Sequence, residues 1–428
     1  MTLLADARAL APDLVRLRRR LHRRPETGLR LPYTQEAVLR ELDGLGLEIT
    51  TGRALTSVVA VLRGGAVPAP ASPGGGAVPG SPGPGGGALP GRAAPAVLLR
   101  ADLDALPLRE RTGIADASRV PDAMHACGHD LHAAMLVGAA RLLAERRHRL
   151  AGDVVLMFQP GEEGHDGARL MLDEGLLDAS GRRPVAAYAL HATTAGPLGA
   201  FTNRAGPALA GSGSLTVTVR GAGGHSAWPH TARDPIPALC ETVTALQSAV
   251  TRSFDPFEPV VLGVGVLRAG TQAGIIPGTA TFEATLRALT GPALARLRDL
   301  AVRTCRGVAA AHGLEVDIEY TDGYPATLND AGEAGFVGAT VAELHGEHRF
   351  TAGERPAMVS DDIGRVLAAV PGVMTSLGAR PPGLDRAAAA PNHSPYALFD
   401  DSVLSDGAAL LAELALRRLA AQADPGRA

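Results

Sequence analysis

Apolar residues recur three and four positions apart in several stretches of the chain, and this spacing predicts helices that bury one face. The first such stretch covers residues 5–23. The second runs from Thr34, a candidate N-cap residue, to Leu45. Three more helices are expected at residues 131–147, 332–346 and 402–420.

Three continuous apolar runs have no polar alternation and therefore predict strands that are buried on both faces. They cover residues 96–100, 154–159 and 185–190. Helical stretches separate them, which is typical of a mostly parallel sheet with helices on both sides. Two other strands are expected at residues 57–62 and 372–377.

Ionisable side chains follow each of the three buried strands. They are Asp102 with Asp104, Glu162 with Glu163, and His191. In parallel sheets, binding sites form beyond the carboxyl ends of the strands. We therefore expect these side chains to converge with the loop that carries Cys127 and His129.

The pattern changes after residue 206. A half-buried strand is expected at residues 215–219, and elements then follow in the order β-α-β-β-α-β, which is that of a ferredoxin-like unit. The helices are expected at residues 235–251 and 292–312, and the later strands at residues 260–267, 279–289 and 314–320. Cys240 and Cys305 fall on the two helices and are expected to pack in the core of this unit.

These patterns predict an α/β protein in which one domain is inserted into another. The main domain, with a mostly parallel sheet and flanking helices, covers residues 1–206 and 324–428. The inserted ferredoxin-like α+β domain covers residues 207–323.

Residues 64–95 are mostly Gly, Pro, Ala and Ser. Because this stretch lacks the apolar side chains that would offset the entropy of ordering, we expect a flexible surface insertion there.

The composition indicates a globular protein and argues against nucleic acid and membrane as partners. Of the 428 residues, 46% are hydrophobic and 20% are charged, which suits a globular protein with a sizeable core. A net charge of -3 without a basic block, and only 3% aromatic residues, argue against nucleic acid as a partner. No run reaches ~18 apolar residues, so we expect no membrane span. Three scattered cysteines and the absence of a signal-peptide pattern suit a reducing cytoplasm.

Metal-binding residue types are spread along the main domain. A single cysteine or histidine is more often a packing residue than a ligand, but here one predicted domain contains five potential metal ligands. They are Cys127, His129, Glu163, His191 and His393. Five donors exceed what one open catalytic zinc site uses, and they suit two ions that share ligands. His132, one turn after His129, is expected to pack behind the site.

Glu162 follows a buried strand and precedes one of these donors. Beside a water activated by metal, its carboxylate would act as a general base and later return the proton to a leaving amine. Two metals with a base predict hydrolysis of an acyl or phosphoryl bond. The sequence shows no glycine-rich phosphate loop and no basic cluster near these residues.

Seven short motifs occur in order along the chain and span nearly all of it outside residues 64–95. They are residues 21–26 (LHRRPE), 99–107 (LRADLDALP), 125–130 (HACGHD), 158–163 (FQPGEE), 190–191 (LH), 223–230 (GGHSAWPH) and 392–395 (NHSP). This series resembles the binuclear metallo-amidohydrolases of the aminoacylase and carboxypeptidase type. The subgroup that it resembles most contains hippurate hydrolases, N-acyl-amino-acid deacylases and auxin-conjugate (indole-acetyl-amino-acid) hydrolases.

The resemblance implies a role for each candidate residue. The main domain would be catalytic and would bind two divalent metal ions (zinc, manganese, cobalt or nickel) through the five donors named above. Glu162 would be the base, and Asp104 would lie behind the ligands and tune the site. The inserted domain would be a lid whose His225 stabilises the oxyanion, in many relatives across a dimer contact. The resemblance thus implies a homodimer or higher homo-oligomer formed through the lid.

Besides the insertion at residues 64–95, the chain departs from the family pattern at two places. Relatives usually carry an asparagine where this chain has Gly274, so a side-chain amide that would contact substrate is missing. Thr193 and Thr194 follow His191 where relatives often have a proline nearby, so we expect that loop to differ.

The leading hypothesis is an amidohydrolase that cleaves N-acyl amino acids or similar small amides. Arg287 would then pair with the substrate carboxylate, although a solvated strand residue is an equally good interpretation. A small-peptide carboxypeptidase or dipeptidase would need the same metals and base. A catalytically silent scaffold or binding protein is the alternative from another class, and the intact Glu162 argues against it.

Overall fold

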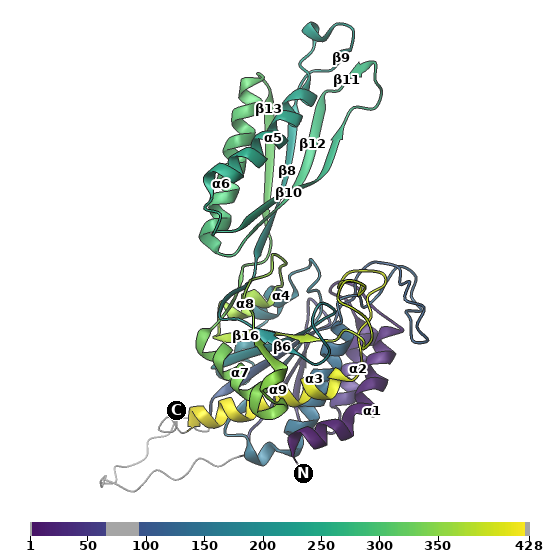
Figure 1. Ribbon diagram of the computed structural model, residues 1–428, viewed down its shortest axis with the longest axis vertical. Coiled ribbons are helices and arrows are strands. Elements are labelled where there is room, and N and C mark those ends of the chain that lie inside the picture. Colours follow the sequence, from purple (N-terminus) through teal and green to yellow (C-terminus); the bar gives the residue numbers. More distant parts are fainter. Residues whose placement is uncertain (1, 66–93, 424–428) are drawn as a thin grey trace, which may run out of the picture.

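The computed structural model describes residues 2–65 and 94–423, and a large sheet forms the centre of its lower body (Figure 1). Eight strands lie in the order β1-β2-β4-β3-β5-β16-β6-β15. They are β1 (Glu48–Thr51), β2 (Val58–Leu62), β3 (Ala96–Asp102), β4 (Asp153–Gln159), β5 (Ala186–Thr193), β6 (Phe201–Asn203), β15 (Phe350–Ala352) and β16 (Gly372–Gly378). The central neighbours β4, β3, β5 and β16 are parallel, whereas β1, β2 and β6 introduce antiparallel pairs. The predicted mostly parallel sheet is confirmed.

Helices cover both faces of this sheet. Successive side chains of a strand point to opposite sides, so a continuous apolar run places apolar side chains on both faces. In β3, Val97 and Leu99 join one core cluster and Leu98 joins the other. The first face carries α1 (Leu3–His22), α2 (Pro32–Leu42), α3 (His129–Glu145), α7 (Ala331–His345) and α9 (Val403–Ala423). The second face carries α4 (Gly167–Asp173) and α8 (Ile363–Leu367). The continuous apolar runs are therefore buried from both sides, as predicted.

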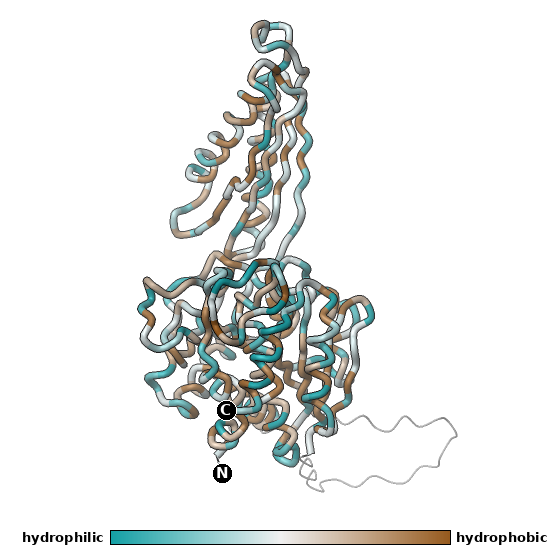
Figure 2. Tube along the Cα trace, turned by 90° about the vertical axis from the view of Figure 1, so that its right-hand side faces the viewer, coloured by the Kyte–Doolittle hydropathy of each residue, from teal (hydrophilic) through white to brown (hydrophobic). Residues whose placement is uncertain are grey.

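A second sheet extends away from the first and forms the upper part of the molecule (Figures 1 and 2). Its four antiparallel strands lie in the order β10-β12-β8-β13. They are β8 (Gly211–Arg220), β10 (Val260–Ala269), β12 (Thr279–Ala288) and β13 (Glu315–Asp322). Helices α5 (Pro235–Ser253) and α6 (Gly291–Ala311) share its core. The predicted β-α-β-β-α-β order is thus confirmed, and with it the α/β fold that contains an α+β insertion.

Two short ladders mark the two ends of this inserted unit. At its base, β7 (Gly206–Leu209) pairs with β14 (Thr327–Asn329). At its far tip, β9 (Gly224–His225) pairs with β11 (Ile275–Ile276), as Figure 1 shows. The boundaries 206/207 and 323/324 stay a prediction. Short 3₁₀ helices lie at Arg147–Arg149, Leu176–Asp178, Pro229–Thr231 and Glu347–Arg349.

The N-cap prediction for the second helix is wrong. α2 begins at Pro32, so Thr34 lies inside its first turn. Instead, the carboxylate of Glu26 accepts hydrogen bonds from the N–H groups of Tyr33 (3.2 Å) and Thr34 (2.8 Å). The first N–H groups of a helix lack partners within it, so a carboxylate from outside can satisfy them as an N-cap would.

Two further details differ from the sequence-based expectations. β1 is missing from them because all four of its residues are exposed and carry no apolar pattern. Cys240 is exposed and does not pack in a core, whereas Cys305 is buried as expected. Burial raises the pKa of the Cys305 thiol to about 12.

Two further predictions concern the insertion at residues 64–95 and the absence of a membrane span. The insertion at residues 64–95 lies almost wholly outside the described residues, which omit 66–93. Within the described ranges, no helix combines the length and the hydropathy that a membrane crossing needs.

Candidate metal centre and active site

The five predicted metal donors lie together at the carboxyl edge of the large sheet. Sγ of Cys127 is 3.5 Å from Nε2 of His191 and 3.2 Å from Nε2 of His393. Oε1 of Glu163 is 3.2 Å from Nε2 of His393. A nitrogen of His129 lies within 4.8 Å of the donor atoms of Cys127 and His191, and also of a Glu163 oxygen. These distances link all five residues into one cluster.

Two tight backbone turns bring the donors in from separate parts of the chain. Gly128, between Cys127 and the start of α3, has a φ of 86°, and a Cβ there would lie 3.1 Å from the Cβ of Ala192. Only glycine fits this turn without strain. His393 also has a positive φ of 68°, and its N–H donates to the carbonyl of Ala126 at 2.9 Å. The cysteine and histidine loops are therefore joined directly.

Backbone carbonyls fix the orientation of two of the imidazoles. Nδ1 of His129 donates to the carbonyl of Asp104 at 2.8 Å, and Nδ1 of His191 donates to the carbonyl of Ala192 at 2.9 Å. In each neutral ring, Nε2 then carries the lone pair that binds a metal. Within the described part of the chain, the buried atoms Nε2 of His129 and Oε1 of Glu163 have no hydrogen-bond partner. Because buried polar atoms normally have partners, this donor set fits divalent cations.

The candidate base is held directly beside the donors. One carboxylate oxygen of Asp104 accepts the N–H of Glu162 at 2.9 Å, and the other accepts the N–H of Glu163 at 3.0 Å. The hydroxyl of Tyr324 donates to the carbonyl of Glu162 at 2.5 Å. Oε2 of Glu162 lies 4.0 Å from Nε2 of His129. The turn after β4 therefore points both glutamates at the same cluster.

A buried positive charge lies under the cluster. Arg100 is 1% exposed, and its guanidinium is 2.6 Å from Asp102 and 3.2 Å from both Asp361 and Asp362. Burial alone would raise the pKa of Asp102, but the attraction of Arg100 and of nearby histidines outweighs it, and the pKa is held well below its ordinary value. Burial also raises the pKa of Glu162, and the charge of Asp361 raises it further. One guanidinium thus balances several carboxylates that would otherwise repel one another.

His132 packs behind the cluster, as expected from its position. Its Nδ1 donates to Asp102 at 2.5 Å, and its Nε2 accepts the N–H of Ala192 at 2.7 Å. Since Nε2 accepts a hydrogen bond, His132 must be neutral, and burial lowers its pKa accordingly. His132 thereby ties β3 to the strand that carries His191.

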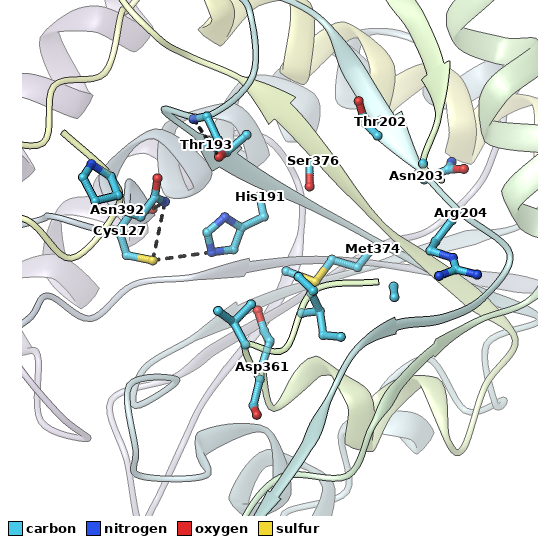
Figure 3. Close-up of a pocket in the computed structure, with 18 of the residues that line it drawn as sticks. Cys127, His191, Thr193, Thr202, Asn203, Arg204, Asp361, Met374, Ser376 and Asn392 are labelled. Atoms are coloured by element: carbon cyan, nitrogen blue, oxygen red, sulfur yellow. Dashed lines mark hydrogen bonds between the residues drawn. The ribbon is translucent and has the colours of Figure 1, made fainter. Parts of the chain in front are cut away.

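A cavity of about 620 Å³ opens beside the donors. Cys127, Glu163, His191 and His393 line one end of it, together with Glu162. Figure 3 shows Cys127, His191 and Asn392 together at this end. The cavity continues along β5, β6 and β16, so a small molecule placed in it would lie against the candidate base and the metal donors.

The family model described as Peptidase family M20/M25/M40 matches residues 98–417 of this sequence. The chain belongs to this family. Because the relatives of this family are named as amide hydrolases, the chain is an enzyme of the class that hydrolyses amide bonds, as the resemblance implied. This assignment argues against the silent-scaffold alternative.

The similarity to individual members of the family extends over nearly the whole length of this chain. It is 33% identical to IAA-amino acid hydrolase ILR1-like 5 of Arabidopsis thaliana, over 95% of this chain and 86% of the relative. It is 30% identical to thermostable carboxypeptidase 1 of Saccharolobus solfataricus, over 96% of this chain and 97% of the relative. The solved structure of the YXEP protein of Bacillus subtilis, a dinuclear metal binding peptidase from the M20 family, superposes with a TM-score of 0.77 at 26% identity. That match covers 96% of this chain and 99% of the other.

Two candidate residues of the inserted unit lie away from the M20 donor cluster. His225 is exposed in β9, and Gly274 precedes β11, so both lie at the tip (Figure 1). The carbonyl of Gly274 accepts the N–H of Ser226 at 3.1 Å. The structure thus brings these two residues together but places them away from the cavity.

The third candidate, Arg287, lies on β12 near the base of the inserted unit. Its Nη1 donates to the carbonyl of Met358 and to the hydroxyl of Ser360, both at 3.0 Å. Ser360 lines the cavity, whereas Arg287 does not. The guanidinium therefore lies behind the cavity wall in this arrangement.

Sequence reasoning missed several residues that build the site. Tyr324 contacts the Glu162 turn, and Asp361 and Asp362 contact Arg100; the sequence predicts none of these contacts. Oδ1 of Asp361 also accepts the N–H of Ile363 at 2.8 Å at the start of α8. Arg100 stands in one of the family motifs, but nothing in its spacing indicates partners so distant in sequence.

Proposed function

We propose that this M20 chain hydrolyses the amide bond of N-acyl amino acids with two divalent metal ions held by Cys127, His129, Glu163, His191 and His393. The observation that carries the proposal is that these five donors lie together beside Glu162, and that the buried Nε2 of His129 has no hydrogen-bond partner in the described ranges. When bound, the two ions would supply Lewis acidity that polarises the amide carbonyl and makes water a better nucleophile.

Glu162 is the proposed general base. Its carboxylate takes a proton from the attacking water and delivers it to the nitrogen of the leaving amine, so the same group serves both halves of the reaction. Asp104 positions it, because the Asp104 carboxylate holds the N–H groups of both Glu162 and Glu163. Arg100 holds the surrounding carboxylates in place without entering the cavity.

The proposed metals are zinc, manganese, cobalt or nickel. A thiolate, three imidazoles and a carboxylate are a mixed soft and borderline donor set, which suits these ions better than magnesium or calcium. The dinuclear metal binding of the YXEP relative supports two ions rather than one. Metal analysis of the purified protein by plasma mass spectrometry tests both the number and the identity of the ions.

The proposed oxyanion donor is His225, acting from the lid of a second subunit. Its Nδ1 accepts the N–H of Ala227 at 3.1 Å, so the neutral ring carries its proton on Nε2 and can donate it to an oxyanion. His225 is exposed at the tip, far from the cluster of its own chain (Figure 1). Among the described strands, β10 is an edge strand of the lid sheet and pairs with β12, and such an edge can pair with a second copy. A homodimer through the lid would therefore complete the site.

The lid also contributes to the proposed substrate binding. Arg287 would pair with the α-carboxylate of the amino-acid half after lid movement releases it from Met358 and Ser360. Gly274 leaves open space where relatives carry a side-chain amide, since nothing lies within 4 Å of a Cβ built there. The chain would thus hold the amide through fewer side-chain contacts at the tip.

A small-peptide carboxypeptidase is the second candidate, because the carboxypeptidase of Saccharolobus solfataricus is as extensively similar as the amino acid hydrolases. A substrate screen separates the two. N-acetyl, N-benzoyl and indole-acetyl amino acids should be cleaved in the presence of manganese, cobalt or zinc, whereas dipeptides and longer peptides should be cleaved poorly. Faster cleavage of peptides would establish the alternative, and no cleavage of any amide would overturn both.

We also propose a cytoplasmic location. Cys127 must remain a thiolate to bind metal, and a reducing compartment preserves it. Fractionation of source cells, with the protein followed by antibody, tests this location.

A further inference from the structure

Two arginines line the cavity that also holds the metal donors. Arg204 and Arg355 both line the cavity that contains Cys127 and His191. Figure 3 shows Arg204 across the cavity from Cys127 and His191. The sequence shows no basic cluster here, because the two arginines come from distant parts of the chain and line one cavity only in the fold.

The sheet explains why these two residues reach one place. β6 and β15 are parallel neighbours, with Asn203 opposite Ala352 at the last pair of the register. The chain therefore leaves both strands at the same edge, and Gly353 donates its N–H to the carbonyl of Asn203 at 2.6 Å. Arg204 follows the first strand directly and Arg355 follows the second by three residues.

The backbone of Arg204 is held firmly. Its carbonyl accepts a hydrogen bond from the side-chain amide of Asn329 at 2.9 Å. Asn329 also bonds the backbone of Met374 through both of its amide atoms, at 2.9 and 3.2 Å. This arrangement fixes where the Arg204 side chain enters the cavity.

No described carboxylate forms an ion pair with Arg204 or Arg355. Nε of Arg204 is buried and has no hydrogen-bond partner in the described ranges, whereas Arg355 is exposed. By contrast, the nearby Arg349 pairs with Asp406, and Arg365 pairs with Asp166. Arg204 and Arg355 thus differ from these two arginines, because neither has an acidic partner among the described residues.

Apolar side chains line part of the cavity. They include Leu209, Val359 and Met374, and Figure 3 shows Met374 between His191 and Arg204. A molecule that fills the cavity would place its amide at the metal donors, an apolar segment against these side chains, and its far end beside the two guanidinium groups.

We propose that Arg204 and Arg355 form a subsite for a carboxylate at the end of the substrate remote from the scissile amide. Guanidinium groups pair with carboxylates through two parallel hydrogen bonds, and an apolar surrounding strengthens the pairing. The substrate class is then an N-acyl amino acid with a second carboxylate, carried either by the acyl group or by the amino-acid side chain. The proposal rests on the proposed amide hydrolysis and specifies its substrate.

Matched substrates test the subsite in both directions. N-glutaryl-leucine is compared with N-valeryl-leucine for an acyl carboxylate, and N-acetyl-glutamate with N-acetyl-glutamine for a side-chain carboxylate. In one of the pairs, kcat/KM should be at least about tenfold higher for the acid, as expected for a charge-assisted contact, with most of the difference in KM. The pair that responds identifies the half that carries the carboxylate. Equal rates within both pairs would overturn the proposal.

Variants then assign the preference to the two residues. Arg204→Gln and Arg355→Gln should each reduce the acid preference by roughly tenfold, and the double variant should abolish it. Arg204→Lys keeps the charge without the planar fork and should retain part of the preference. Arg306→Gln, at an exposed arginine of α6, is the matched control and should keep the full preference. A double variant that still prefers the acid would exclude both arginines.

A binding measurement separates failure of the subsite from failure of the proposed function. If the metal-loaded protein cleaves no amide, the hydrolysis proposal is wrong, but calorimetry can still follow binding of the preferred acid. Its Kd should rise roughly tenfold in Arg204→Gln and in Arg355→Gln, with metal content and melting temperature unchanged. Equal affinity of the variants and the original protein would refute the subsite independently of turnover.

Discussion

The side chain of Asp104 holds the backbone of Glu162, since one of its carboxylate oxygens accepts the Glu162 N–H at 2.9 Å. Its second oxygen holds Glu163 in the same way, so a single acid orients both the proposed base and a proposed metal ligand. Neither contact requires Asp104 to touch substrate. Asp104 is therefore a positioning residue, and its substitution should disturb geometry rather than remove a reacting group.

Asp104→Asn tests this role. An amide in place of the carboxylate turns one acceptor into a donor that faces a backbone N–H, so one of the two hydrogen bonds is lost. We expect kcat to fall by about 10- to 100-fold, as for other residues that orient metal ligands, together with weaker metal binding. The measurement is turnover alongside metal titration. Unchanged values of both would remove Asp104 from the site.

Glu162→Gln tests the proposed base. The amide keeps the shape of the side chain but cannot accept the proton, so we expect turnover to fall by roughly 10²–10⁴ with both metals still bound. The rate is measured at saturating substrate, and the metal content by plasma mass spectrometry. Because Glu163 stays intact, loss of metal would instead indicate that Glu162 is a ligand. Near-normal turnover would refute the mechanism.

Cys127→Ser tests the thiolate ligand. Cys127 lies within 3.5 Å of two proposed ligand histidines, and a hydroxyl binds borderline metals more weakly than a thiolate does. We expect the metal content after dialysis to drop and the excess of metal needed for activity to rise. Cys240→Ser, at the exposed cysteine of α5, is the matched control and should change neither value. An equal response of both variants would show that the effect is not specific to the site.

Acid stability gives a test outside the metal cluster. Burial alone would raise the pKa of Glu110, but hydrogen bonds from His22, the Ser118 N–H and Thr112 outweigh it and lower the pKa to about 2. A carboxyl whose pKa is lower in the folded state stabilises the fold above its unfolded value of about 4.3 and loses that contribution as the pH falls toward 2.

Glu110→Gln should therefore be less stable than the original chain at pH 6, and the difference should shrink steadily between about pH 4.5 and pH 2. Urea unfolding of the metal-free proteins at several pH values measures this difference. A gap that stays constant over that interval would show that Glu110 does not titrate with a lowered pKa.

The elements that build the site were predicted where their local pattern is strong. β3, β4 and β5 are continuous apolar runs, and each ends in the acidic or imidazole side chains that were expected to converge. The ferredoxin-like order of elements was also predicted, because the hydrophobic pattern repeats several times along each of its long helices and alternating strands.

What could not be predicted depends on contacts between distant segments. β6 and β15 have three residues each, too few to show a period, and so the sequence could not predict that Arg204 and Arg355 line one cavity. The pairing of Arg100 with Asp361 and Asp362 likewise joins segments that have no shared sequence signal. The exposed Glu48–Thr51 strand was not predicted either, because it is defined by its pairing with β2 and not by a pattern of its own.

His225 provides the last test, because its proposed role requires two subunits. In His225→Ala, kcat should fall by roughly 10²–10³, as for a lost oxyanion donor, with metal content intact. If His225 serves the partner's site, mixing His225→Ala with Glu162→Gln protein should restore activity. Some hybrid dimers then contain one site with an intact Glu162 from one chain and an intact His225 from the other. Subunit exchange is verified with differently tagged chains, and a mixture of two Glu162→Gln preparations is the control. Exchanged hybrids without any recovery would place His225 in the site of its own chain, through closure of the lid.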